Sequence, residues 1–104
     1  MNKHINIAVI GLGQIGSYVY NELNIKKKDI EIKTGKRIKV VGISAKNKNK
    51  KRKFKINKKI FYSNPLDILK IKNLHIIIEA IGLSDGISKK IIETALKNKI
   101  HVIT

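Results

Sequence analysis

Cysteine and tryptophan are absent from this 104-residue chain, which also has only one proline. Without thiols it can form neither disulfides nor thiolate metal sites, so an intracellular, cytoplasmic protein is expected. The three histidines, His4, His75 and His101, lack the spacing of metal ligands, and no metal site is predicted. No apolar run reaches the ~18 residues that span a bilayer, so no membrane partner is expected.

Acidic residues are scarce as well. The chain has seven acidic and 23 basic residues, which gives a net charge of +16. Such a chain binds polyanions through counterion release. However, isoleucine, lysine and asparagine supply 22, 21 and 10 residues, so biased residue usage explains much of the excess. We therefore expect only non-specific contact with nucleic acid.

Aromatic residues are few (5%), whereas 42% of the residues are hydrophobic, which predicts a folded domain with an aliphatic core. Continuous β-branched runs are typical of strands buried on both faces. Strands are predicted at 5–10, 38–44, 60–62, 74–80 and 100–103. The run from 46 to 59 is very basic, contains no acid and is predicted to be a solvated loop.

Helices are predicted between these strands, at 15–33, 65–72 and 87–97. Ile15, Val19 and Leu23 lie four residues apart, which predicts the buried face of the first helix. Gly35 is suited to end that helix in the left-handed conformation. Asn64 with Pro65 should begin the second helix.

The third helix should begin at Ser84 or Asp85 and leave through a left-handed Asn98. Alternation of strands with helices predicts one α/β domain over residues 1–104. Its fold should be Rossmann-like, with a mostly parallel twisted sheet and helices on both faces.

A glycine pattern follows the first predicted strand. Gly11, Gly13 and Gly16 match G-x-G-x-x-G between a strand and a helix, the context in which this motif binds a dinucleotide pyrophosphate. Gly11 permits the tight turn, Gly13 lets the backbone approach the anion, and Gly16 lets the helix pack on the strand. The N–H groups of Gly13, Gln14 and Ile15 should then point at the phosphates. A glycine turn without a ligand is the alternative.

The end of the second predicted strand should read the adenosine ribose. An acid there favours NAD, whereas cationic residues favour the 2′-phosphate of NADP. This chain has Ser44 and Lys46 and no acid nearby, so NADP is predicted, with NAD possible. Lys46 is the candidate phosphate ligand, assisted by Ser44. Alternatively, these lysines simply begin the solvated basic loop.

Four further stretches are specific: residues 7–17 (IAVIGLGQIGS), 29–38 (DIEIKTGKRI), 78–82 (IEAIG) and 95–104 (ALKNKIHVIT). In this order they resemble the N-terminal coenzyme domain of homoserine dehydrogenase, over essentially the whole chain. The long first helix ending in Thr-Gly-Lys-Arg distinguishes this family from most Rossmann domains.

The resemblance implies an oxidoreductase that interconverts aspartate semialdehyde and homoserine, a step in threonine, methionine and isoleucine biosynthesis. It implies a small-molecule substrate and a homo-oligomer for the full-length enzyme. By position, the glycine turn would hold the pyrophosphate and Lys46 the adenosine side. Ile81, Gly82 and Thr104 would lie near the coenzyme.

The chain departs from this family at several positions. Gly82-Leu83 stands where paired glycines are usual, Lys99-Ile100 where Gly-Lys is common, and His75 where an acid is common. The family motif continues past Thr104 into Ala-Asn-Lys. The expectation is therefore that the catalytic domain, with its lysine and acids, is missing, and no residue here is assigned a catalytic role. Glu79 is expected to be structural, bonded to nearby backbone or hydroxyl groups.

Two alternative functions stay open. One is the coenzyme-binding half of another oxidoreductase, such as an aspartate or sugar dehydrogenase. The other is a nucleotide- or nucleic-acid-binding module that uses residues 46–59. Phe54 is the only aromatic residue of that stretch, which is poor provision for base stacking.

Overall fold

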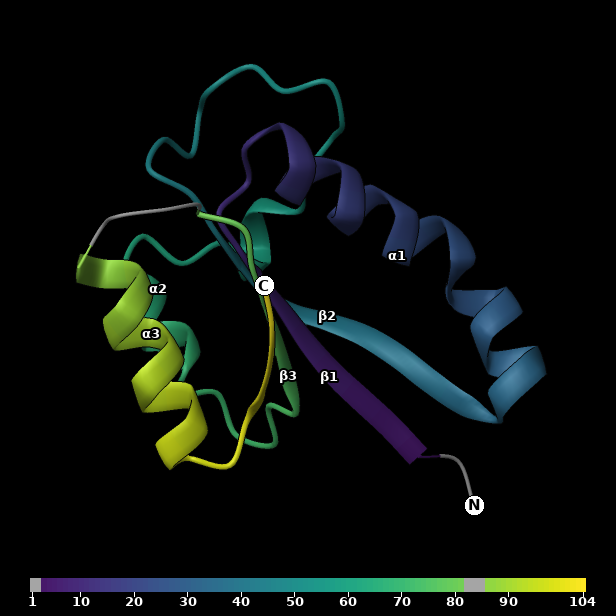
Figure 1. Cartoon of the computed structure of the whole chain (residues 1–104). Helices are drawn as coiled ribbons and strands as arrows, with labels where there is room; N and C mark the ends of the chain where they lie inside the picture. The colour runs from purple at the N-terminus through teal and green to yellow at the C-terminus, as the bar shows by residue number, and fades with distance from the viewer. Residues whose placement is uncertain (1–2, 82–85) are drawn as a thin grey trace.

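The computed structural model describes residues 3–81 and 86–104 and has the predicted α/β architecture (Figure 1). Its elements are β1 (Lys3–Ile10), α1 (Gln14–Thr34), β2 (Lys36–Ser44), the 3-10 turn η1 (Lys58–Ile60), α2 (Pro65–Ile68), β3 (Ile76–Glu79), α3 (Gly86–Lys97) and β4 (His101–Ile103). The four strands form one sheet in the order β2-β1-β3-β4, and every pairing is parallel. A parallel Rossmann sheet is thus confirmed.

Apolar side chains are buried on both faces of this sheet. On one face Ala8 and Ile10 of β1 pack with Ile68 of α2 and Ile91 of α3. On the other face Val9 packs with Tyr20 of α1 and Ile43 of β2. The alternation along β1 follows from the two-residue period of a strand. Helices therefore cover both faces, as predicted, with α1 on one side and α2 and α3 on the other (Figure 1).

The first helix has the predicted length, but its buried face is only partly the predicted one. Leu23 packs against the core as predicted, and Val19 is half-buried. Tyr20, at 5% exposure, and Gly16 are buried, whereas Ile15 is 74% exposed. The expectation that Ile15 lies in the core is wrong, because Gly16 must face β1 for the helix to approach the turn. Since Tyr20 is four residues after Gly16, it shares that face.

The distal end of α1 explains the Thr-Gly-Lys-Arg segment. Gly35 has φ 72° and donates its N–H to the Glu31 carbonyl (2.8 Å), as the sequence predicted for this helix end. Thr34 Oγ1 donates to the Ile30 carbonyl (2.7 Å) and accepts from the Lys36 N–H (3.1 Å). Arg37 pairs with Glu31. These contacts turn the chain directly from α1 into β2.

The third predicted strand, 60–62, is wrong as a strand. Phe61 makes a single parallel bridge to Ile43, and the Tyr62 N–H donates to the Ile43 carbonyl (2.8 Å). Strand pairing ends there because helix α2 begins three residues later. The Asn64 side chain caps this helix by accepting from the Leu66 N–H (3.0 Å), and Pro65 is its first residue, as predicted.

Helix α2 is shorter than the predicted 65–72. After Ile68 the chain continues in i→i−3 turns, such as Ile71 N–H to the Ile68 carbonyl (3.0 Å), and leaves through Asn73 at φ 63°. The next strand is also shorter than 74–80. At its start, His75 Nδ1 accepts the Asn6 N–H (2.9 Å), so a side chain replaces the usual backbone partner.

The exit of helix α3 differs from the prediction. Lys99, with φ 59°, takes the left-handed conformation, and Asn98 does not. The Asn98 N–H still bonds to the Thr94 carbonyl (3.1 Å), so the helical hydrogen bonding extends through it. Lys99 stands where the resemblance places a glycine. The predicted caps Ser84 and Asp85 lie outside the described residues.

Within residues 3–81 and 86–104, no helix combines the length and the apolar character needed to cross a bilayer. The same residues contain no group of three or more potential side-chain ligands placed to hold a metal ion.

Candidate functional site

The glycine turn lies at the carboxyl end of β1, in the middle of the sheet. Gly11 has φ +96°, and its N–H donates to the Ser44 carbonyl at the end of β2 (2.9 Å). A Cβ on Gly11 would lie 2.8 Å from backbone atoms of Ala80 and Ile81, which follow β3. Only glycine fits this position, so the turn is pinned between the two neighbouring strands.

The start of helix α1 packs directly on this turn. A Cβ on Gly16 would overlap the Gly11 carbonyl oxygen and lie 2.9 Å from the carbonyl carbon. Ser17, which is buried, donates its hydroxyl to the Leu12 carbonyl (2.9 Å), and its N–H bonds to the Gly13 carbonyl (2.9 Å). The turn is therefore rigidly joined to the first turn of α1.

Gly13, unlike Gly11 and Gly16, faces open space. It is exposed, and an added Cβ would meet no atom within 4 Å. The amides of Gln14, Ile15 and Gly16 stand at the start of a 21-residue helix, where they have no intrahelical acceptor. These donors, the positive end of the helix dipole and the open approach at Gly13 together suit an anion such as a diphosphate.

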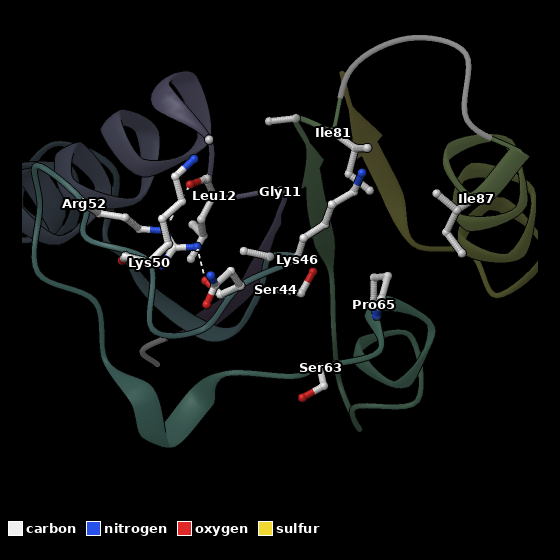
Figure 2. Close-up of a pocket in the computed structure, with 14 residues that line it drawn as sticks. Gly11, Leu12, Ser44, Lys46, Lys50, Arg52, Ser63, Pro65, Ile81 and Ile87 are labelled. Carbon is white, nitrogen blue, oxygen red and sulfur yellow. Dashed lines mark hydrogen bonds between the residues drawn. The ribbon is translucent and has the colours of Figure 1, made fainter.

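A cavity of about 510 Å³ opens beside the turn, between the carboxyl ends of β1, β2 and β3. Its wall combines apolar groups with three cations, and none of its described lining residues is acidic. Those residues are Gly11, Leu12, Gly13, Ser44, Ala45, Lys46, Asn47, Lys50, Arg52, Ser63, Pro65, Ala80, Ile81 and Ile87. Figure 2 shows Lys46 extending across the cavity in the direction of Ile81.

The basic loop, residues 45–57, is fastened at two places to the first part of α1 and the turn before it. Near the middle of the loop, Arg52 donates Nε–H to the Leu12 carbonyl (3.2 Å). At the end of the loop, the Asn57 N–H donates to the hydroxyl of buried Tyr20 (3.2 Å). Although Lys46 and Lys50 are exposed, the loop is not simply solvated: these fastenings set one side of it against the cavity.

This arrangement, a glycine turn and open cavity where parallel strands end, matches a known sequence family. Residues 5–104 match the family described as "Oxidoreductase family, NAD-binding Rossmann fold". The chain belongs to this family. It is thus an NAD(P)-binding Rossmann domain.

Individual relatives are homoserine dehydrogenases. The domain is 26% identical to the Bacillus subtilis enzyme and 24% identical to the Neisseria gonorrhoeae enzyme, over 98% of its own length and 23% of theirs. Its fold matches a crystal structure of homoserine dehydrogenase from S. aureus with a TM-score of 0.88 and 34% identity, covering 96% of this chain and 26% of that one. The chain therefore spans about a quarter of the length of these relatives.

The residues of the turn fit the coenzyme that the family description names. A diphosphate needs a backbone that it can approach without a Cβ in the way, and Gly13 provides it. The cavity continues from the turn past Ser44 and Lys46 on one side and Ile81 on the other, so an extended dinucleotide can lie across the strand ends.

Glu79 has the structural role predicted for it. It is 7% exposed, accepts the Ile81 N–H at Oε1 (3.1 Å) and accepts the Ser88 hydroxyl at Oε2 (2.9 Å). Oε1 thus holds the chain just after β3, and Oε2 joins the end of β3 to α3. His75 and His101 lie at or near strand ends on the amino side of β3 and β4, away from the cavity.

The structure brings together several of the residues singled out from the sequence: Gly11, Gly13, Ser44, Lys46 and Ile81 all line the cavity. Gln14, Ile15 and Gly16 lie beside them at the head of α1. Thr104 follows β4 and is exposed, and it is not among the lining residues. Gly82 lies outside the described residues.

Sequence reasoning missed other lining residues, above all Lys50, Arg52, Ser63 and Ile87. Two signals could have found some of them. The predicted Asn64–Pro65 helix start must lie at the carboxyl edge of the sheet, which places Ser63 there. Arg52 is one of only two arginines among 23 basic residues, so its side chain stands out from a lysine-rich loop.

Proposed function

We propose that this domain binds NADP(H) for a homoserine dehydrogenase, which interconverts L-aspartate 4-semialdehyde and L-homoserine by hydride transfer. The observation behind the proposal is the pairing of an open, amide-lined glycine turn with an acid-free cavity that contains Lys46. Similarity to homoserine dehydrogenases across 98% of the chain favours this enzyme over an aspartate or sugar dehydrogenase.

The bound coenzyme would supply the hydride, and the domain would hold and orient it. The amides at the head of α1 bind the diphosphate, with the helix dipole favouring its charge. The apolar wall near Ile81 and Ile87 shields the remainder from water. A substrate site and proton-transfer groups are not proposed among these residues.

The residues at the end of β2 would decide between NADP and NAD. Lys46 and Lys50 line the cavity there, and no described lining residue offers a carboxylate to a ribose 2′-hydroxyl. Ser44 also lines the cavity but is only 2% exposed, and its main-chain carbonyl is bonded to Gly11, whereas Lys46 is exposed. We therefore propose Lys46 as the principal ligand of the 2′-phosphate of NADP, and Ser44 as an assisting residue.

Calorimetric titration with NADPH and NADH tests this proposal. The domain should bind NADPH more tightly than NADH. Lys46→Gln should weaken NADPH binding by about tenfold, because a charge-assisted contact is lost. NADH affinity should change by no more than about twofold. Lys97→Gln removes the same charge from the far end of α3 and serves as the matched control. Absence of binding with either coenzyme at millimolar concentration would contradict the proposal.

The remaining expectations belong to the same proposal. The whole enzyme would be a cytoplasmic homo-oligomer with a small-molecule substrate, and nucleic acid would contact the basic loop only non-specifically. These 104 residues alone should bind coenzyme without oxidising homoserine. Homoserine-dependent formation of NADPH by the isolated chain, followed by the absorbance of the reduced nicotinamide, would overturn that expectation.

A further inference from the structure

Arg52 makes more hydrogen bonds than any neighbouring side chain of the basic loop in the described structure. Besides the Nε–H bond to Leu12, its Nη1 donates to the carbonyls of Lys48 (3.3 Å) and Lys50 (3.1 Å), and its Nη2 donates to the carbonyl of Asn47 (2.6 Å). One guanidinium thus joins three carbonyls of the loop to one carbonyl of the glycine turn. Figure 2 shows it on the loop side of the cavity, beside Leu12.

These contacts use most of the donors of the side chain. A guanidinium has five N–H groups, and four are directed at main-chain oxygens of the protein. The paired N–H groups that would grip a phosphate in bidentate fashion are therefore already engaged. The guanidinium is placed to hold the chain rather than to bind a coenzyme.

The loop needs such a fastening because of its charge. Seven of the twelve residues from 46 to 57 are Lys or Arg and none is acidic, and segments of like charge repel and extend. The 47–50 segment is instead folded into a turn, with the Lys50 N–H near the Asn47 carbonyl (3.4 Å) and the Asn49 N–H on Asn47 Oδ1 (3.0 Å). That turn brings Lys46 and Lys50 to the same cavity.

We infer that Arg52 is a positioning residue that determines coenzyme specificity: it fixes the 46–50 segment on the glycine turn so that Lys46 and Lys50 converge on the adenosine end of the coenzyme. This inference rests on the proposed function. The inference goes beyond that function by assigning the preference for NADPH to a side chain whose donors are directed at the protein's own main chain.

Lysine cannot take over this role. An ammonium is a compact group with three donors on one nitrogen, and it cannot span four carbonyls set around a planar fork. Arg52→Lys keeps the charge and the number of tryptic sites but removes the fork, whereas Arg52→Gln removes both charge and fork. Lys51→Gln, at an exposed neighbouring position, removes one charge from the same loop and is the control.

Calorimetric Kd values for NADPH and NADH on the wild type and these three variants test the inference. We expect Arg52→Lys and Arg52→Gln each to raise the Kd for NADPH by about tenfold and the Kd for NADH by at most about threefold. The selectivity for NADPH over NADH therefore falls. Lys51→Gln should change both affinities by no more than about twofold. Wild-type affinity in Arg52→Lys would overturn the inference, because charge alone would then suffice. Equal losses in Lys51→Gln and Arg52→Gln would overturn it too.

Limited trypsin digestion without coenzyme separates failure of this inference from failure of the proposed function. If the wild type binds neither coenzyme, the proposed function fails. Cleavage after Lys48 and Lys50 then reports on the loop alone. Cleavage about fivefold faster in Arg52→Lys supports loop fixing by Arg52, since proteolysis follows the opened population. An unchanged rate overturns it.

Discussion

The glycine turn and the basic loop both border the cavity, but they are held in place by opposite means. The turn is fixed because side chains are missing: Gly11 and Gly16 leave room for backbone to contact backbone. The loop is fixed because one side chain is present, the Arg52 fork on four carbonyls. Crowding enforces the first shape and hydrogen bonds the second, so substitutions should affect them very differently.

The largest effect is expected at Gly16. In Gly16→Ala the new methyl would overlap the Gly11 carbonyl oxygen, so helix and turn must separate. We expect a loss of about 3 kcal/mol in the free energy of unfolding, at the upper end for overpacking, together with loss of coenzyme binding. Urea unfolding followed by circular dichroism measures it. A stability within about 0.5 kcal/mol of wild type would show that crowding does not fix the turn.

Gly13→Ala is the matched control on the same turn, and its effect should appear in binding instead. The position has φ −72° and open space around it, so stability should hold or rise by about 0.5 kcal/mol. The methyl would occupy the approach of the diphosphate, and NADPH affinity should fall by about 10- to 100-fold. Calorimetry next to urea unfolding separates the two readouts; unchanged affinity would mean that the diphosphate does not lie there.

On the loop, removing a single fastening should cost less. Tyr20→Phe deletes the hydroxyl that accepts the Asn57 N–H (3.2 Å), and we expect a loss of about 1 kcal/mol in stability. NADPH affinity should change by less than about threefold, because Arg52 still holds the 47–50 segment of the loop. Tyr18→Phe, on an exposed ring, should leave stability unchanged. Equal effects of the two variants would argue against the Tyr20 fastening.

The smallest expected effect is an increase in stability. It tests the backbone freedom of glycine at a position where a positive φ, and not crowding, favours glycine. Lys99 takes φ 59° at the exit of α3, which costs a residue with a Cβ about 1 kcal/mol. Lys99→Gly should therefore raise stability by roughly 0.5 kcal/mol after the entropy of the unfolded chain is counted. Lys97→Gly, inside the last turn of the helix, should lower it by about as much. Differential scanning calorimetry resolves both; a lower melting temperature for Lys99→Gly would contradict this account.

Much of the fold could be predicted because local patterns and tertiary packing agree. The run ending at Ile10, the left-handed Gly35 and the Asn64 cap each follow from residue types within a few positions. Predictions failed where a distant contact decided the outcome. Ile15 fits the apolar helical period, yet the approach of Gly16 to Gly11 turns the buried face toward Tyr20. The segment 60–62 has strand composition, yet the adjacent α2 cap limits it to one bridge.

The candidate site divides in the same way. The sequence alone determined the glycine turn, the parallel sheet and the acid-free end of β2, because each depends on neighbouring residues and on the handedness of crossovers. Only the tertiary structure decided that the basic loop lies against the cavity. Leu12 and Arg52 are 40 residues apart; the sequence singles out Arg52 as an arginine among lysines but does not show which acceptors lie within its reach. Hydrogen bonds between distant segments depend on where the fold places them, and no local pattern encodes that.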